Sequence, residues 1–141
     1  LEQQGVDVYF GKPDLASTVA VDSFLNDAVS ALEEEVSLMV NAVGISPNVP
    51  LEEQTLSGPD GWRNVFEVNV FNAFVSTRAV AHRMRNWGVK GSIVLITSTN
   101  GINSYAPYSV AYDCSKAAMI PRTTAARRSS RSTARYARTC R

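Results

Sequence analysis

The sequence predicts an α/β protein in which helices cover both faces of a parallel β-sheet. Strand and helix patterns alternate along the chain, and the strand patterns at residues 36–40 and 91–96 are continuous apolar runs. Such runs are typical of parallel strands that are buried on both faces. Because ligand sites in these sheets form beyond the carboxyl ends of the strands, we expect Asn41 and Ser98 at that edge.

The amino-terminal elements have clear local signals. Residues 8–10 predict a short strand, which Gly11 and Pro13 close. Ser17 or Thr18 can cap the helix that follows. An apolar face at helical spacing predicts that this helix is amphipathic, and it consists of Val21, Phe24, Leu25, Ala28, Val29 and Leu32.

The middle of the chain predicts a long helix between two strands. Residues 45–59 contain three prolines and are expected to form a loop after the strand at 36–40. A helix should run from residue 60 to about 87, where Gly88 ends it. After the strand at 91–96, a polar loop leads from Ser98 into a last helix.

Composition excludes several classes of protein. The chain has 141 residues, 45% of them hydrophobic and 19% charged, which is the size and balance of one globular domain. No apolar run reaches the roughly 18–20 residues of a membrane span. Two cysteines predict neither a disulfide framework nor a zinc site, so we expect no metal and a reducing, cytoplasmic location. Because the first residue is Leu1 and not Met, a longer parent protein is expected.

The charge is divided unevenly along the chain. Residues 1–120 have a formal charge of −6, whereas residues 121–141 hold seven arginines and no acidic residue. Pro121 is expected to break the last helix, and the arginine-rich tail behind it lacks Val, Leu, Ile and Phe. We interpret residues 121–141 as disordered or non-native, for example an out-of-frame translation. Without a recognition motif, the tail predicts no specific nucleic-acid binding.

Tyr112 and Lys116 are the most informative pair of residues. On a helix, residues four apart share one face, so the lysine ammonium can lie close to the phenol. A nearby positive charge favours the phenolate, which prepares the tyrosine for proton exchange. Ser98, at the end of a strand, can hold a carbonyl or alcohol oxygen beside it. These three side chains indicate an oxidoreductase.

Four features in a fixed order strengthen this interpretation. Residues 41–44 (Asn-Ala-Val-Gly) follow a strand, Asn69 lies on the long helix, Ser98 follows the next strand, and Tyr112 precedes Lys116 by four residues. In combination, over roughly residues 1–120, they resemble the short-chain dehydrogenase/reductase family. The resemblance implies part of a Rossmann-like doubly wound sheet, about three strands with flanking helices, and NAD or NADP as cofactor.

The resemblance also implies roles for individual residues. Tyr112 is the general acid/base and also lies at the cofactor, and Lys116 stabilises its phenolate and binds the nicotinamide ribose. Ser98 orients the oxygen of an alcohol or carbonyl substrate, and Asn69 holds a water that links Lys116 to solvent. From the residues alone, Asn69 could instead be an ordinary helix asparagine, and Ser98 could simply bond to loop backbone.

Three more residues are implied at the cofactor. Asn41 and Gly44 match the ends of the family's Asn-Asn-Ala-Gly motif, although Ala42 and Val43 depart from it. Asp14 matches the acidic residue that contacts adenine. A turn or helix-cap role for Asp14 is equally open.

The glycine-rich dinucleotide loop of the family is absent from the sequence. The resemblance therefore implies a fragment that begins just before the family's third strand and that also lacks the family's carboxyl-terminal substrate segment. We expect the chain alone to be inactive, with a non-catalytic interaction module as the alternative. The helices at 60–87 and 112–120 are expected to join subunits of the parent into a homo-oligomer.

Overall fold

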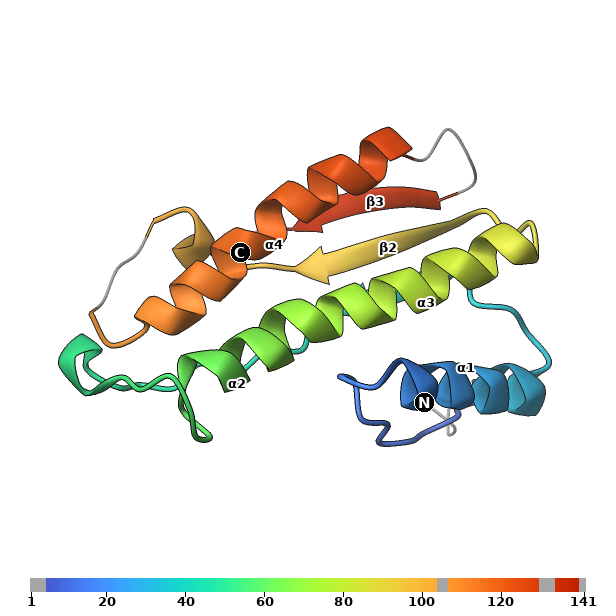
Figure 1. Ribbon diagram of the computed structural model, residues 1–141. Helices are drawn as coiled ribbons and strands as arrows, with labels where there is room; N and C mark the ends of the chain where they lie inside the picture. Colours follow the sequence, from blue (N-terminus) through green and yellow to red (C-terminus); the bar gives the residue numbers. More distant parts are fainter. Residues whose placement is uncertain (1–4, 104–106, 130–133, 140–141) are drawn as a thin grey trace.

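A computed structural model describes residues 5–103, 107–129 and 134–139, with side chains described up to residue 120. Its sheet consists of β1 (Leu38–Asn41), β2 (Gly91–Ile96) and β3 (Ala134–Thr139). All pairs are parallel, in the order β1-β2-β3. Figure 1 shows the long helix α3 and the helix α4 running along this sheet, with α1 beside α3. The predicted parallel α/β architecture is confirmed.

Helix α1 (Thr18–Leu32) begins where the sequence predicts. The side chain of Ser17 accepts a hydrogen bond from the backbone N–H of Ala20, which caps the first turn. Val21 of α1 packs against Val75 and Ala79 of α3, and this contact fixes α1 beside the long helix.

The long helix contains one π-helical turn that the sequence does not reveal. Helix α2 (Trp62–Phe66), the π-turn η3 (Glu67–Phe71) and α3 (Asn72–Asn86) follow each other without a break. A π-turn inserts one extra residue into a helix and redirects the side chains around it. Here it buries Asn69, which is 1% exposed.

The core lies between the sheet and the two long helices. Ile93 and Leu95 of β2 pack against Val80 and Met84 of α3 and against Met119 of α4. The register places Val40 of β1 beside Val94 on the opposite face of the sheet. On that face, Leu38 and Val40 are 59% and 56% exposed.

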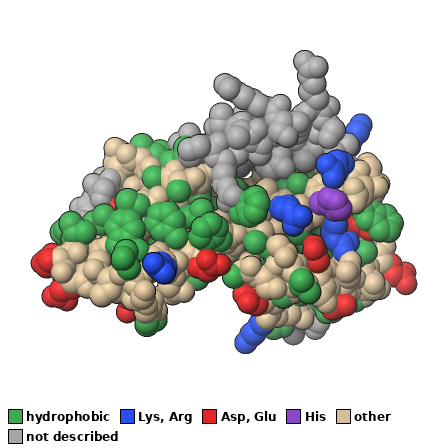
Figure 2. All heavy atoms as spheres, in the orientation of Figure 1, with side chains coloured by type: hydrophobic (Ala, Val, Ile, Leu, Met, Phe, Trp, Pro, Cys, Tyr) green, Lys and Arg blue, Asp and Glu red, His purple; other side chains and the backbone are tan. Residues whose placement is uncertain are grey.

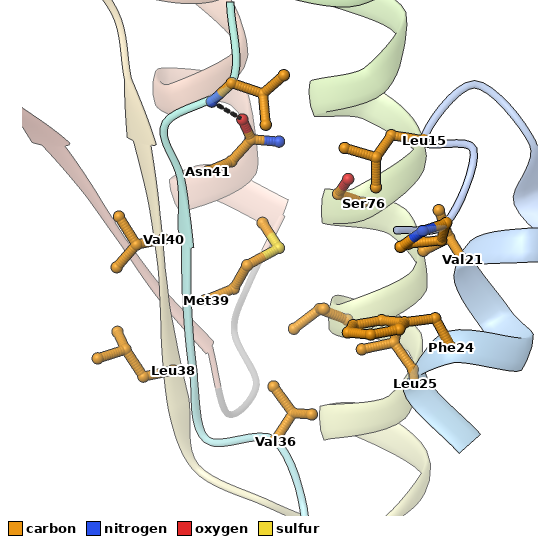
Figure 3. A pocket seen from close by; sticks show the side chains of 13 residues that line it. Leu15, Val21, Phe24, Leu25, Val36, Leu38, Met39, Val40, Asn41 and Ser76 are labelled. Atoms are coloured by element: carbon orange, nitrogen blue, oxygen red, sulfur yellow. Dashed lines mark hydrogen bonds between the residues drawn. The ribbon is translucent and has the colours of Figure 1, made fainter. Parts of the chain in front are cut away.

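Figure 3 shows the same division, with Met39 and Asn41 turned toward α3, and Leu38 and Val40 turned away. Among the described residues, helices therefore cover one face of the sheet only. The expected cover on both faces is not complete in this chain, because no described helix packs on the face of Leu38 and Val40.

Two predictions about secondary structure are wrong, one about a strand and one about the end of a helix. Residues 8–10 form no strand; Tyr9 instead contacts the ring of Phe24, with the ring centroids 5.5 Å apart. A strand is held by hydrogen bonds to a neighbour, and the described residues offer none at that position. In addition, α4 (Val110–Ser129) continues through Pro121 instead of ending there.

The tail thus has more structure than its composition suggests. Pro121 removes one hydrogen bond of the helix ladder, but alanine and arginine dominate the residues that follow and both are strong helix formers. β3 then pairs with β2 through backbone groups, whose hydrogen bonding does not depend on side-chain type. Residues 121–129 lie in α4 and residues 134–139 form β3, and the interpretation of residues 121–141 as disordered or non-native stays a prediction.

Candidate active site

Tyr112 and Lys116 share one face of α4, as their spacing predicts. The ammonium nitrogen of Lys116 lies 5.7 Å from the centroid of the Tyr112 ring. Lys116 is 3% exposed, whereas the ring of Tyr112 is half-buried and accessible from outside. A half-buried tyrosine therefore lies beside a buried lysine.

Lys116 is held by backbone carbonyls at the ends of two strands. Its Nζ donates to the carbonyl oxygen of Ile96 at 3.2 Å and to that of Val43 at 3.4 Å. Both carbonyls lie at the carboxyl edge of the sheet, where the fold predicts a site. Burial lowers the pKa of Lys116 from its ordinary value of 10.5, because desolvation disfavours the charged form.

Gly44 leaves the space that this lysine needs. A Cβ atom at Gly44 would lie 3.1 Å from Nζ of Lys116 and 3.4 Å from Oδ1 of Asn69. Any larger residue would displace one of these groups. The glycine that the motif predicts therefore has a physical reason in this structure, namely the close approach of Lys116 and Asn69.

Asn69 connects the loop after β1 to helix α4. Its Oδ1 accepts from the backbone N–H of Ile45 at 2.8 Å, and its Nδ2 donates to the carbonyl of Ile45 at 3.0 Å and to Oγ of Ser115 at 2.8 Å. Both amide protons are thus in use. One lone pair of Oδ1 remains for the predicted water, and this role of Asn69 stays a prediction.

Asn41 braces the end of β1. Its Oδ1 accepts from the backbone N–H of Val43 at 3.1 Å, a bond drawn in Figure 3, and its Nδ2 donates to Oδ1 of Asn72 at 2.9 Å. These bonds hold the turn that presents the carbonyl of Val43 to Lys116. Asn41 therefore acts on the site through the backbone.

Ser98 and Asp14 lie in different surroundings. Ser98 is 9% exposed, and its Oγ accepts from the backbone N–H of Asn100 at 3.2 Å. Asp14 is exposed, and its carboxylate accepts from the backbone N–H of Ala16 at 3.0 Å, which is a turn role. No described contact joins Asp14 to Tyr112 or Lys116, and its adenine contact stays a prediction.

Sequence reasoning missed two buried residues that support the site. Ser115 is fully buried, and its hydroxyl donates to the backbone carbonyl of Tyr112 at 2.7 Å while it accepts from Asn69. Asn72, 3% exposed, binds Asn41. Their positions carry a signal: Ser115 directly precedes Lys116, and Asn72 follows Asn69 by three residues.

A cavity of about 330 Å³ lies beside β1, between α1 and α3. Apolar side chains line most of it, and Figure 3 shows Phe24, Leu25 and Val36 at its wall. Neither Tyr112 nor Lys116 reaches it. Tyr112 and Lys116 are therefore separate from this cavity.

Comparison with known proteins identifies the chain. The sequence model described as short chain dehydrogenase matches residues 1–134. This chain belongs to the short-chain dehydrogenase family. Cyclopentanol dehydrogenase of Comamonas testosteroni is 32% identical over 123 residues, which are 84% of this chain and 45% of that protein.

Other relatives agree with this assignment. L-2,3-butanediol dehydrogenase of Corynebacterium glutamicum is 30% identical over 113 residues, 80% of this chain and 42% of the relative. The crystal structure of a short-chain dehydrogenase/reductase from Burkholderia phymatum in complex with NAD superimposes with a TM-score of 0.86 at 25% identity, over 99% of this chain and 49% of that one. The chain spans about half the length of the relatives it matches.

Burial of Lys116 predicts a pH dependence of stability. A lysine whose pKa is lower in the folded state binds fewer protons there than when unfolded. The free energy of unfolding should therefore rise with pH between that lowered pKa and 10.5. Urea titrations at successive pH values should show this rise in the wild type and not in Lys116→Met. If the difference in the free energy of unfolding between the wild type and Lys116→Met stayed constant over this pH range, the prediction would be contradicted.

Proposed function

We propose that this chain forms the proton-transfer half of an NAD(P)-dependent dehydrogenase that interconverts small alcohols and ketones. The observation that carries the proposal is the buried ammonium of Lys116 beside the accessible phenol of Tyr112. Relatives named as dehydrogenases of cyclopentanol and of 2,3-butanediol support a small secondary alcohol as substrate.

The residues fit the nicotinamide end of such a cofactor. Two N–H groups of Lys116 donate to carbonyls, which leaves the third for a ribose hydroxyl. Because Gly44 has no side chain, it leaves room for this nitrogen. The described chain has no glycine-rich loop for the pyrophosphate, so we expect weak or no binding when the 141-residue chain is titrated with NADH or NADPH.

When bound, the nicotinamide exchanges a hydride with the carbon that bears the substrate oxygen. Tyr112 gives its phenolic proton to that oxygen during ketone reduction and takes it back during alcohol oxidation. The ammonium of Lys116 stabilises the phenolate that remains. Ser98 donates its hydroxyl proton in a hydrogen bond to the same oxygen, which stabilises the charge that develops there.

A hybrid enzyme tests the proposal. In cyclopentanol dehydrogenase of Comamonas testosteroni, the 123-residue matching segment is replaced by that of this chain. The hybrid should reduce NAD or NADP with cyclopentanol or 2,3-butanediol, whereas the 141-residue chain alone should not. A hybrid that binds NADH but turns over neither alcohol would refute the proposal and favour the non-catalytic alternative.

We further propose that the parent is a homo-oligomer joined through the helices at 60–87 and 112–120. Phe71 and Phe74 are 50% and 46% exposed on the long helix, and Figure 2 shows hydrophobic side chains gathered on this face of the molecule. Exposed apolar patches often mark interfaces between proteins. In the hybrid, Phe74→Asp should lower the mass measured by light scattering, whereas Phe10→Asp, at a site 78% exposed, should not. An unchanged mass in Phe74→Asp would argue against this interface.

A reducing, cytoplasmic location is proposed on the cysteine content. Cys114 is an exposed free thiol, which suits a reducing compartment. Among the described helices, none combines the length and the apolar character of a bilayer span. Fractionation of the source cells, followed by detection of the protein in the cytoplasmic fraction, tests the location.

A further inference from the structure

The loop after β2 is fastened to helix α4 next to Tyr112. Asn100, in the 3₁₀ turn η4 (Thr99–Gly101), donates one hydrogen bond within the loop and one to α4. Its backbone N–H donates to Oγ of Ser98 at 3.2 Å, and its Nδ2 donates to Oδ1 of Asp113 at 2.9 Å. Asn100 thus links the serine hydroxyl to the residue that directly follows the tyrosine.

A second contact fixes the same loop one turn further along α4. A Cβ atom at Gly101 would lie 2.8 Å from the backbone nitrogen of Ala117 and 2.8 Å from the carbonyl carbon of Lys116. The loop therefore touches the helix backbone directly. Two fixed points, at Asp113 and at residues 116–117, allow little rotation or sliding of the loop.

Burial makes the bond between Asn100 and Asp113 significant. Asp113 is 5% exposed and Ser98 is 9% exposed. Hydrogen bonds to a carboxylate are shorter and stronger than neutral ones, and a polar pair shielded from water holds its geometry firmly. An aspartate beside the candidate acid/base tyrosine is thus engaged in locating the serine loop.

We propose that Asn100 and Asp113 are positioning residues that hold the Ser98 hydroxyl in place for the substrate oxygen beside Tyr112. This inference rests on the proposed function. Because Ser98 accepts a hydrogen bond from Asn100, its own proton is left to donate. The same bond selects one of the staggered rotamers that a free serine would populate.

The first test uses the isotope-labelled 141-residue chain and two-dimensional NMR. Asn100→Asp puts two carboxylates together and should shift the amide resonances of Ser98 and Tyr112. Asp113→Asn keeps an acceptor and should shift them less. The double variant, Asn100→Asp with Asp113→Asn, restores one hydrogen bond in the opposite direction and should return them toward wild type. Asn103→Asp, on the exposed side of the same loop, is the matched control.

The second test measures kinetics in the hybrid enzyme. Asn100→Asp should lower kcat by about tenfold to a hundredfold, because misplacement of a catalytic group by about 1 Å has effects of this size. The KM for the cofactor should stay the same, and the double variant should recover most of the lost kcat. If the pair of Asn100 and Asp113 were purely structural, Asn100→Asp would lower the thermal stability and leave the kcat of the folded fraction unchanged.

Failure of this inference is distinct from failure of the proposed function. An inactive wild-type hybrid would defeat the proposed function, and the NMR comparison alone would then decide whether the pair holds Ser98. Resonances of Ser98 and Tyr112 that respond no more to Asn100→Asp than to Asn103→Asp would overturn the inference. If the wild-type chain alone gives a disordered spectrum, the same resonances are compared in the isotope-labelled hybrid, where the same lack of response would overturn the inference.

Discussion

Tyr112→Phe should lower kcat of the hybrid enzyme by about 10²–10⁴-fold, the range expected for the loss of a general acid/base. Phenylalanine keeps the ring that packs beside Lys116 but has no proton to exchange with the substrate oxygen. Ketone reduction and alcohol oxidation should fall together, since both use the same proton. Initial rates with saturating cofactor measure the effect.

Two observations separate this result from a loss of folding. NADH binding by the variant hybrid should match that of the parent hybrid, because the phenol oxygen contributes little to the cofactor affinity as a whole. Tyr108→Phe is the matched control: Tyr108 is 47% exposed, four residues earlier in the chain. If Tyr112→Phe retained more than about a tenth of kcat, another group would have to be the acid/base.

The elements that sequence reasoning predicted well depend on local patterns. Strand β2 has the predicted bounds because Ile93 to Ile96 form an uninterrupted apolar run. Gly91 and Ser92 precede the run, and Thr97 follows it. The cap of α1 at Ser17 follows from the preference of serine for that position. The neighbourhood of Tyr112 and Lys116 follows from helix geometry alone.

The elements that were missed or wrong depend on contacts between distant residues. Asn69 reaches Ile45 and Ser115, which are 24 and 46 residues away, and no local pattern indicates these bonds. The bond between Asn100 and Asp113 likewise requires knowledge of how a loop lies on a helix. The strand predicted at residues 8–10 does not form for a related reason. A strand pattern produces a strand only where a neighbouring strand can pair with it.

Asn69→Ala should lower the free energy of unfolding by about 2 kcal/mol or more, since each buried polar group left without a partner costs about 1–3 kcal/mol. The substitution removes the partner of the N–H and the C=O of Ile45 and one of two hydrogen bonds of the Ser115 hydroxyl, which keeps its bond to the carbonyl of Tyr112. Ser115 is fully buried, so water cannot replace the lost bond there. Urea unfolding followed by circular dichroism measures the change.

The π-turn makes this loss larger than that of an ordinary helix asparagine. It turns Asn69 inward, where one amide connects the loop after β1 to α4 through Ser115, which in turn binds the carbonyl of Tyr112. Asn86→Ala, at an exposed position near the end of α3, should change the free energy of unfolding by less than about 0.5 kcal/mol. Equal effects of the two substitutions would mean that Asn69 has no bracing role. A large effect of Asn69→Ala alone would show that the asparagine in the π-turn braces the loop after β1 against α4, the helix on which Tyr112 and Lys116 lie.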